Sequence, residues 1–397
     1  VKELTATLGT TALELKESYG RYTAVIPAEL VQGVSLTVTV RGTDGKGVAM
    51  ESSVTVTVKD EPMISNMQPV ANSQTRENKR PVISAKLSNA GDKPTVTMTI
   101  NGQQVAVTYA DGTVTYAPTA DMAEGRTTVI LTVTRQDGKT ATKKWSFTVG
   151  EAKYILLYGQ LHSHTGEYSD GSGTLASALE YIAALPEEAK VDFVAFTDHS
   201  NSFDKPEAPN PEEALYDLDL ATPEAREKWT TYKTVMAEFN KAHANEILAL
   251  PGFEMTWSGG PGHMNTFVTE GIVSRNNKTL NNKAADAGMR AYYELLTRDE
   301  GEDSITQLNH PGATFGNFTD FSYWTPEADS RVYLVEVGNG EGPIPSAGYF
   351  PSYEQYNMAL DKGWHVAPTN NQDNHKGKWG NANEGRDVIL AEEFTEE

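Results

Sequence analysis

A strand that ends in a pair of histidines is the feature that most constrains this chain. The apolar residues at 155–157 have the length and bounds of a buried strand, and the sequence YGQLHSHTGEYSDG follows at 158–171. His162 and His164 stand at the end of this strand, before Asp170 in a loop rich in Gly and Ser. Side chains two positions apart on an extended segment point the same way, so both imidazoles can bind one cation. A strand that ends in metal-ligand residues favours an α/β barrel, whose chemistry lies at the carboxyl ends of its strands.

One such pair is equally compatible with two unrelated surface histidines, so the rest of the chain has to decide. With 397 residues, the chain is long enough for two or three domains. It has no apolar stretch of membrane-spanning length. Its net charge of −21 argues against nucleic acid or anionic lipid as the main partner. A small phosphorylated substrate is still compatible with this charge, because bound divalent metals would reverse the field locally.

The sequence contains no cysteine. Disulfides and thiolate metal sites are therefore excluded, and any metal must be held by His, Asp and Glu. The chain begins at Val1 without a signal peptide, so we expect a mature form or an excised fragment of a longer protein.

The first 150 residues are expected to be all-β. Val and Thr alternate at 36–40, 54–58, 96–100 and 129–134. Hairpin signals lie between the expected strands, at Asp44-Gly45, Asn101-Gly102, Asp111-Gly112 and Asp137-Gly138. A Thr/Val strand followed by an Asp-Gly-Lys turn occurs twice, in copies about 90 positions apart, which suits tandem sandwiches of about 100 residues. The pattern resembles bacterial immunoglobulin-like modules, a partial one at 1–60 and another at 61–150. A spacer or adhesion role, with possible cell-wall or surface association, fits these modules, which contain no histidine.

From residue 151 to 397 the pattern changes to strands that alternate with helices. Thr174 is a helix cap before a stripe of Leu175, Leu179 and Ile182. Thr222-Pro223 begins a second helix, which should bury Trp229, Tyr232, Met236 and Phe239. Expected strands lie at 191–197, 247–253, 263–268, 305–309, 332–337, 366–368 and 388–390. This alternation predicts parallel pairing, and the number of strands suits a closed barrel.

Metal-ligand residue types gather at the ends of these strands. They are His162, His164, Asp170, His199, Glu254, His263, His310, Asp373 and His375. This set holds six of the eight histidines, a concentration that chance does not explain. The other two, His243 on a helix stripe and His365 beside Trp364, are expected to be structural.

These motifs resemble the PHP (polymerase and histidinol phosphatase) superfamily of metal-dependent phosphoesterases. The matching segments are HSH with Asp170, TDH at 197–199, GFE ending at Glu254, His263, NHPG at 309–312 and DNH at 373–375. The branch that looks closest contains bacterial hydrolases named after carbaryl hydrolase, often exported and often fused to β domains. The resemblance implies a distorted (β/α)7 barrel with two or three divalent metal ions, for which His and carboxylate ligands suit Zn, Mn or Fe.

The resemblance also implies how the ligands are shared. The first metal would be held by His162, His164, Glu254 and Asp373. Glu254 would bridge to a second, completed by His263 and His310. The third would be held by Asp170, His199 and His375. Many family members have His where Asp170 stands, which affects the third site. Glu254, Asp373 and His199 are the residues expected to carry the chemistry.

Further residues are candidates for supporting roles. Alternation along the strand points Asp198 away from His199, so we expect it to hydrogen-bond around the ligands instead of binding metal. Residues that could contact substrate are Asn309, Asn339, Lys376 and Arg275, with Asn370, Lys378 and Arg386 as further possibilities. Turn, helix-cap or solvated-surface roles remain open for all of them.

Three functions follow from this sequence. The first is a phosphoesterase acting on a small phosphomonoester or phosphodiester through a metal-activated water. The second is hydrolysis of a carboxylic ester, carbamate or amide on the same metals. The third is an inactive cell-surface binding or adhesion protein, which the intact ligand set disfavours. Tandem sandwich modules favour a secreted or cell-surface bacterial protein.

Overall fold

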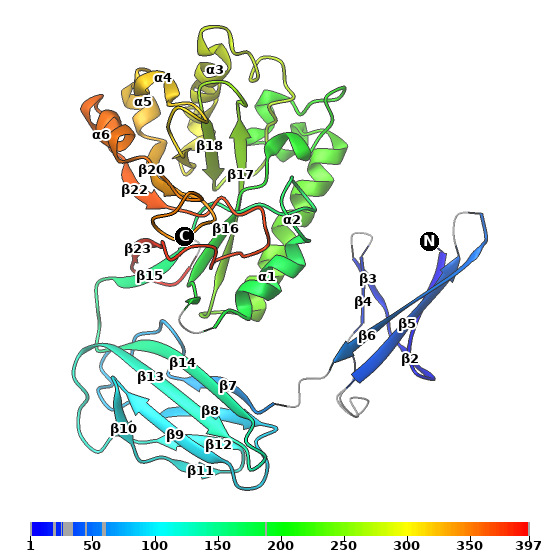
Figure 1. The fold of residues 1–397 in the computed structure, drawn as a ribbon, viewed down its shortest axis with the longest axis vertical. Helices are drawn as coiled ribbons and strands as arrows, with labels where there is room; N and C mark the ends of the chain where they lie inside the picture. Colours follow the sequence, from blue (N-terminus) through cyan, green and yellow to red (C-terminus); the bar gives the residue numbers. More distant parts are fainter. Residues whose placement is uncertain are drawn as a thin grey trace. The chain divides into compact units, whose positions relative to one another are not determined.

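The computed structural model describes residues 2–18, 21–24, 26, 35–43, 46–57, 61–186 and 189–395. The chain divides into two compact units (Figure 1). One is formed by Val1–Pro69 with Asn78–Ser146, and the other by Val70–Glu77 with Phe147–Glu397. Segment 70–77 lies with the carboxyl-terminal unit because its backbone pairs with the chain around Thr148, where Thr75 N donates to Thr148 O at 2.9 Å.

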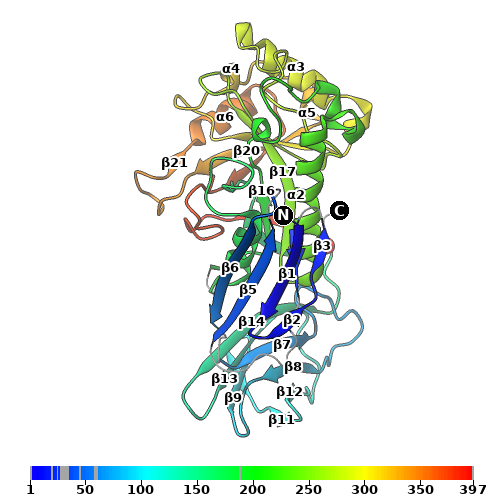
Figure 2. The same cartoon turned by 90° about the vertical axis from the view of Figure 1, so that its right-hand side faces the viewer.

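The first β module is an antiparallel sheet in the order β2-β1-β5-β6, with a separate hairpin of β3 and β4 (Figure 2). The strands are β1 (Lys2–Leu8), β2 (Thr11–Leu13), β3 (Lys16–Ser18), β4 (Arg21–Thr23), β5 (Ser35–Thr43) and β6 (Ala49–Thr57). The hydroxyls of Thr37 and Thr55 form a hydrogen bond of 2.8 Å between β5 and β6. Both residues belong to the Val/Thr alternation that predicts these two strands. The expected turn at Asp44-Gly45 lies outside the described residues.

The second β module consists of two antiparallel sheets, in the orders β10-β9-β13-β14 and β11-β12-β8-β7. Its strands are β7 (Met63–Gln68), β8 (Ile83–Ser88), β9 (Thr95–Ile100), β10 (Gln103–Val105), β11 (Thr108–Ala110), β12 (Thr113–Tyr116), β13 (Gly125–Thr134) and β14 (Thr140–Val149). Alternate side chains of both sheets are buried, as the period-two pattern predicts. Asn101-Gly102 and Asp111-Gly112 form the expected hairpin turns, with positive φ at all four residues.

A curled, mixed sheet organises the carboxyl-terminal unit. Its order is β21-β20-β19-β18-β17-β16-β15-β23, and β22 pairs with β20. The strands are β15 (Ile155–Gln160), β16 (Phe193–Phe196), β17 (Leu248–Thr256), β18 (His263–Phe267), β19 (Ile305–Asn309), β20 (Val332–Asn339), β21 (Phe350–Pro351), β22 (Ala367–Asn370) and β23 (Asp387–Ala391). The sheet forms a curled half-barrel instead of the closed barrel that the number of strands suits. Beyond the carboxyl ends of β15 and β22, Ser163 and Asn374 form an isolated parallel bridge.

The expectation of uniformly parallel pairing is wrong. Strand β18 is antiparallel to both β17 and β19, and β23 is antiparallel to β15. The physical reason lies in the connections. Only a short turn separates Thr256 from His263, and a short connection joins antiparallel strands, whereas parallel strands need a long crossover. Because β18 is reversed, its first residue lies at the edge where the parallel strands end.

Helices cover the outside of this sheet (Figure 1). They are α1 (Leu175–Ala183), α2 (Pro223–Ala242), α3 (Ala287–Leu296), α4 (Phe318–Phe321), α5 (Pro326–Asp329) and α6 (Tyr353–Asp361). Both predicted caps are confirmed, since the side chains of Thr174 and Thr222 accept from Ser177 N and Ala225 N. The predicted stripes are buried, except that Phe239 is only partly buried. A smaller apolar cluster, including Leu157 and Phe193, fills the inside of the curl.

Candidate metal centre

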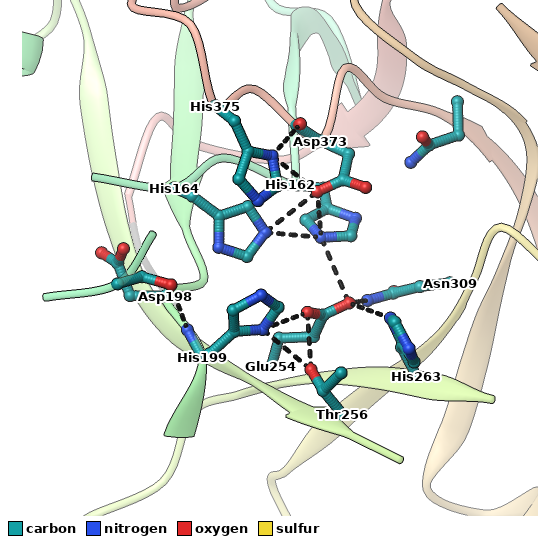
Figure 3. Close-up of polar contacts among 12 residues, drawn as sticks. His162, His164, Asp198, His199, Glu254, Thr256, His263, Asn309, Asp373 and His375 are labelled. Carbon is teal, nitrogen blue, oxygen red and sulfur yellow. Dashed lines mark hydrogen bonds and ion pairs between the residues drawn. The ribbon is translucent and has the colours of Figure 1, made fainter. Parts of the chain in front are cut away.

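The two histidines after β15 lie side by side at the open edge of the curled sheet (Figure 3). Both His162 and His164 are completely buried, and their Nε2 atoms are 3.2 Å apart. Their backbone is fixed by the other end of the curl, because Asp373 N donates to His162 O at 3.1 Å and His164 N donates to Asn374 O at 2.9 Å. The buried indole of Trp379 also donates to His164 O, at 2.9 Å. The extended i, i+2 spacing therefore points both rings into the same space.

Other strands bring ligand-type residues to the same edge. They are His199 after β16, Glu254 within β17, His263 at the start of β18, His310 after β19, and Asp373 and His375 after β22. The backbone is strained at two of these positions, with φ of +29° at His310 and +48° at Asp373. Strained φ of this kind persists only where the surroundings enforce it, and it concentrates at functional sites.

The donor atoms of these residues fall into four overlapping groups, in each of which all atoms lie within 4.8 Å of one another. The groups are His162, His164 and Glu254; His162, His310 and Asp373; Glu254, His263 and His310; and His164, Asp170, His199 and His375. All nine ligand residues expected from the sequence are thus brought together. These buried clusters could hold metal ions.

The carboxylate of Glu254 lies at the centre of the cluster and its two oxygens face different neighbours. Oε1 is 3.3 Å from Nδ1 of His263 and 3.5 Å from Nε2 of His162. Oε2 is 2.6 Å from Nδ1 of His199, and it also accepts from the Thr256 hydroxyl at 2.8 Å. Oε1 is therefore the oxygen available to a cation between His162 and His263.

Asp373 also faces two subsites. Its Oδ1 lies 3.0 Å from Nε2 of His164 and 3.2 Å from Nε2 of His162. Its Oδ2 lies 3.6 Å from Nε2 of His310. Asp373 thus spans imidazoles that the PHP resemblance assigns to two different metals.

The group that contains Asp170, His199 and His375 is closer to solvent. Asp170 Oδ1 lies 3.4 Å from Nε2 of His199 and 3.3 Å from Nε2 of His375. The Asp170 side chain is 66% exposed, whereas that of Glu254 is 1% exposed. A cation held by this group would be the most accessible to water.

Burial and neighbouring charges set the protonation of the cluster. Burial alone would raise the pKa of Glu254 and Asp373, but the surrounding histidines outweigh it and hold both pKa values well below their ordinary range. Burial lowers the pKa of His164 to about 4, so this imidazole is neutral near pH 7. Burial opposes charge on His162 as well, yet the carboxylates Asp373 and Glu336 raise its pKa well above 6.5.

This pattern fits divalent metal ions. Three carboxylates lie among the imidazoles and attract positive charge. In the metal-free protein a proton on His162 supplies part of this charge, and a bound metal ion would take the place of that proton. Nδ1 of His164 and Nδ1 of His310 are buried and have no hydrogen-bond partner among the described residues. Groups of His and carboxylate donors suit Zn, Mn or Fe.

Glu336 contacts two of the candidate ligands and is not among the residues expected from the sequence. It is completely buried in β20, and its carboxylate accepts from four groups: His162 Nδ1 at 2.8 Å, His310 N at 2.7 Å, Asn339 Nδ2 at 2.8 Å and Gln307 Nε2 at 3.2 Å. A proton held on Nδ1 of His162 leaves its Nε2 lone pair for the cluster. A single Glu within the apolar strand VYLVEV was the available signal.

Asp198 points away from the cluster, as alternation predicts. It is completely buried and accepts from Thr165 N at 2.7 Å and from the Tyr232 hydroxyl at 3.1 Å. Burial raises its pKa to about 7. Its contacts hold the loop that follows His164, in agreement with the expectation that it hydrogen-bonds around the candidate ligands.

The expected substrate contacts separate into two kinds. Asn339 and Lys376 line a cavity of about 480 Å³ in front of the ligands. Asn309 is completely buried, and its amide donates to Glu254 Oε1 at 2.9 Å, so it positions the carboxylate instead of facing substrate. Arg275 donates to Thr256 O at 2.8 Å and does not line the cavity.

The further candidates are also engaged elsewhere. The Asn370 amide donates to the Tyr349 hydroxyl at 3.0 Å. Arg386 donates to backbone oxygens, including Ala189 O at 3.1 Å. Lys378 does not line the cavity.

The two remaining histidines lie outside the cluster. His243 ends α2 with its ring 4.3 Å from that of Phe239, and the exposed His365 pairs with Asp329 at 2.7 Å. Both placements agree with structural roles. No helix among the described residues is long and apolar enough to cross a membrane.

Comparisons with known proteins add little to this picture. Neither a family model nor a curated protein matches the chain. The solved structures that are similar to part of it include the following three, each at 18% identity. CopC from Methylosinus trichosporium OB3b matches with a TM-score of 0.19, over 23% of this chain and 94% of that chain. The Clostridium thermocellum CbhA fibronectin(III)-like modules match with a TM-score of 0.20, over 38% and 78%. The titin domains z1z2 match with a TM-score of 0.18, over 38% and 82%. Similarities with such low TM-scores carry no argument about the fold or function of this chain.

Proposed function

We propose that this chain is a metal-dependent hydrolase of the PHP superfamily that cleaves small phosphomonoesters or phosphodiesters. The observation that carries the proposal is the convergence of six histidines and three carboxylates on one cluster, four of whose histidines and all of whose carboxylates line a single cavity. The curled sheet, with its ligands gathered at one edge, is compatible with a distorted (β/α)7 barrel. Glu336 and Asn309 do not bind metal in this proposal. They hold the ligand side chains of His162 and Glu254 in place by hydrogen bonds.

Two or three divalent ions (Zn, Mn or Fe) would be held by the four donor groups. When bound, they would supply a water of lowered pKa and positive charge for the phosphoryl oxygens. Glu254 would hold its Oε1 toward His162 and His263 while His199 and Thr256 occupy its Oε2. The exposed Asp170 would leave the third position open to solvent and substrate. Since phosphate esters are anionic, a metal-loaded cluster favours them over neutral substrates.

The test is metal analysis of the purified protein together with rates on three substrates: p-nitrophenyl phosphate, bis-p-nitrophenyl phosphate and 1-naphthyl acetate. We expect at least two metals per chain and turnover of a phosphate ester that is lost on chelation. If only the naphthyl ester is hydrolysed, the protein is a carboxylic ester hydrolase and the phosphoesterase proposal is wrong. A protein that binds no metal and turns over no substrate would overturn the proposal.

Location is a second part of the proposal. We infer that the protein works outside the cell or at its surface, because two β modules precede the hydrolase unit and β modules of this size serve as spacers there. Fractionation of the source cells tests this, and recovery only in the cytoplasm would contradict it.

A further inference from the structure

The cavity beside the metal-ligand cluster has an aromatic wall that the reaction itself does not require. The Phe315 ring lies 4.5 Å from the ring of His310 and 5.7 Å from that of His263. Phe350 lies edge-on to Phe315, with ring centroids 6.4 Å apart. Both phenylalanines line the cavity. An apolar surface therefore begins directly at the ligand residues and continues outward from them.

Both phenylalanines are held by rigid backbone. Phe315 lies in a short loop closed by two hydrogen bonds of 2.9 Å between Gly312 and Gly316. Gly316 has a φ of +103°, and a Cβ there would lie 2.5 Å from the backbone of Pro261, so only glycine allows this loop. Phe350 lies in β21, which pairs with the end of β20.

The side chain of Phe350 is nevertheless 44% exposed. Small-molecule sites are concave and lined largely by apolar and aromatic side chains, and Phe350 contributes to such a lining together with Phe315.

The charges on the rest of the cavity limit what it can accept. Apart from the histidines of the ligand cluster, Lys376 is the only basic side chain among the described lining residues, and its ammonium pairs with Glu341 at 3.1 Å. Glu341 also accepts from the backbone of His375 and of Lys376, both at 2.8 Å. A second phosphate placed away from the metals would find no unpaired cation in this lining. Polyphosphorylated substrates are therefore disfavoured.

We propose that the substrate carries a single anionic group at the metals and a flat apolar group, of aryl type, packed against Phe315 and Phe350. This inference rests on the proposed function, which supplies the anionic group. The aromatic wall then determines specificity. Stacking on aromatic rings and removal of apolar surface from water would favour an aryl ligand over a methyl ligand by about tenfold or more.

The experiment measures binding instead of turnover, by calorimetry on the metal-loaded full chain. The probes are phenylphosphonate against methylphosphonate, and benzoate against acetate. We expect phenylphosphonate to bind about tenfold more tightly than methylphosphonate. Phe350→Ala and Phe315→Leu should each remove most of this preference while leaving the affinity for methylphosphonate within about twofold. Tyr333→Ala, which removes an aromatic ring exposed on β20 away from the cavity, is the matched control and should keep the preference.

The outcomes separate the two proposals. Equal affinity for the aryl and methyl probes, or a preference that survives both Phe substitutions, would overturn the aryl inference. Neither result would contradict the proposed phosphoesterase activity. A preference for benzoate over acetate without phosphonate binding would support the aromatic wall and argue against phosphate as the head group. Failure of all four probes to bind a metal-loaded protein would overturn both.

Discussion

Oε2 of Glu254 lies 2.6 Å from Nδ1 of His199, while Nε2 of the same imidazole faces Asp170 at 3.4 Å. One histidine thus connects the deepest carboxylate of the cluster to the most exposed one. Occupancy of the outer subsite should depend on the inner carboxylate, because the His199 ring is oriented by Glu254 and not by solvent.

Glu254→Gln should therefore remove more than one metal per chain. The substitution keeps the shape of the side chain but removes the charge that compensates neighbouring cations, and its amide cannot serve both His199 and the metals. We expect loss of nearly all activity and a lower unfolding temperature only when metal is present, since bound metal stabilises the native state. Mass spectrometry of the native protein gives the stoichiometry. His243→Ala is the control and should lose neither metal nor rate; full metal content in Glu254→Gln would refute the central role of this carboxylate.

Glu336→Gln should weaken metal binding without unfolding the protein. The four donors around Glu336 all require an acceptor, and an amide presents a donor to at least one of them. If the amide nitrogen faces His162, the proton moves to Nε2 and the metal-binding lone pair is lost. We expect affinity to fall about 10- to 100-fold, measured by competition with a chromogenic chelator. The exposed Glu354→Gln on α6 is the matched control. Nitrogen NMR reports which tautomer His162 adopts. The same tautomer in Glu336→Gln and in the wild type would contradict this mechanism.

Residues 1–150 should be dispensable for the chemistry, because none of the described residues in this range belongs to the ligand cluster or lines the cavity beside it. A protein that begins at residue 61 should keep both its turnover and the stability of its carboxyl-terminal unit. One that begins at residue 151 should keep its metals but unfold at a lower temperature, because it loses segment 70–77, whose Gln74 side chain accepts from Ala152 N at 2.9 Å. Calorimetry and rates on any substrate check both. Loss of activity in a folded, metal-loaded protein of either kind would show that the β modules help to build the site.

Asp387 should make the metal-free protein less stable as the pH rises. It is buried at the start of β23, its Oδ1 accepts from Asn370 N at 2.6 Å, and its Oδ2 has no partner among the described residues. Burial, followed by the charge of Glu336, raises its pKa well above the ordinary value of 3.8. Because the folded pKa exceeds the unfolded one, the stabilising contribution is complete below about pH 4 and is lost as the pH rises through the folded pKa.

Asp387→Asn removes this titration. Urea unfolding at pH 5 and pH 8 should therefore show that the free energy of unfolding of the variant, relative to the wild type, increases between the two pH values. An equal pH dependence in the two proteins would contradict the prediction.

The sequence alone indicated which residues are candidate ligands and where most strands and both helix caps lie. Period-two alternation, capping residues and H-x-H spacing act over a few residues, and local backbone geometry is enough to interpret them. The nine ligand candidates at strand ends therefore meet in the structure as predicted. The same local logic placed Asp198 away from the metals.

Only the tertiary structure decided the direction of β18, the division of Glu254 and Asp373 between neighbours, and the roles of Glu336 and Asn309. Each depends on contacts between residues far apart in the chain. Asn309, for example, has the residue type and position of a substrate contact, but the antiparallel pairing of β17, β18 and β19 brings its amide to Glu254. Glu336 is a lone acid in an apolar strand, and its meaning appears only when four donors from other segments converge on it, because burying a carboxylate is tolerated only where hydrogen bonds satisfy it.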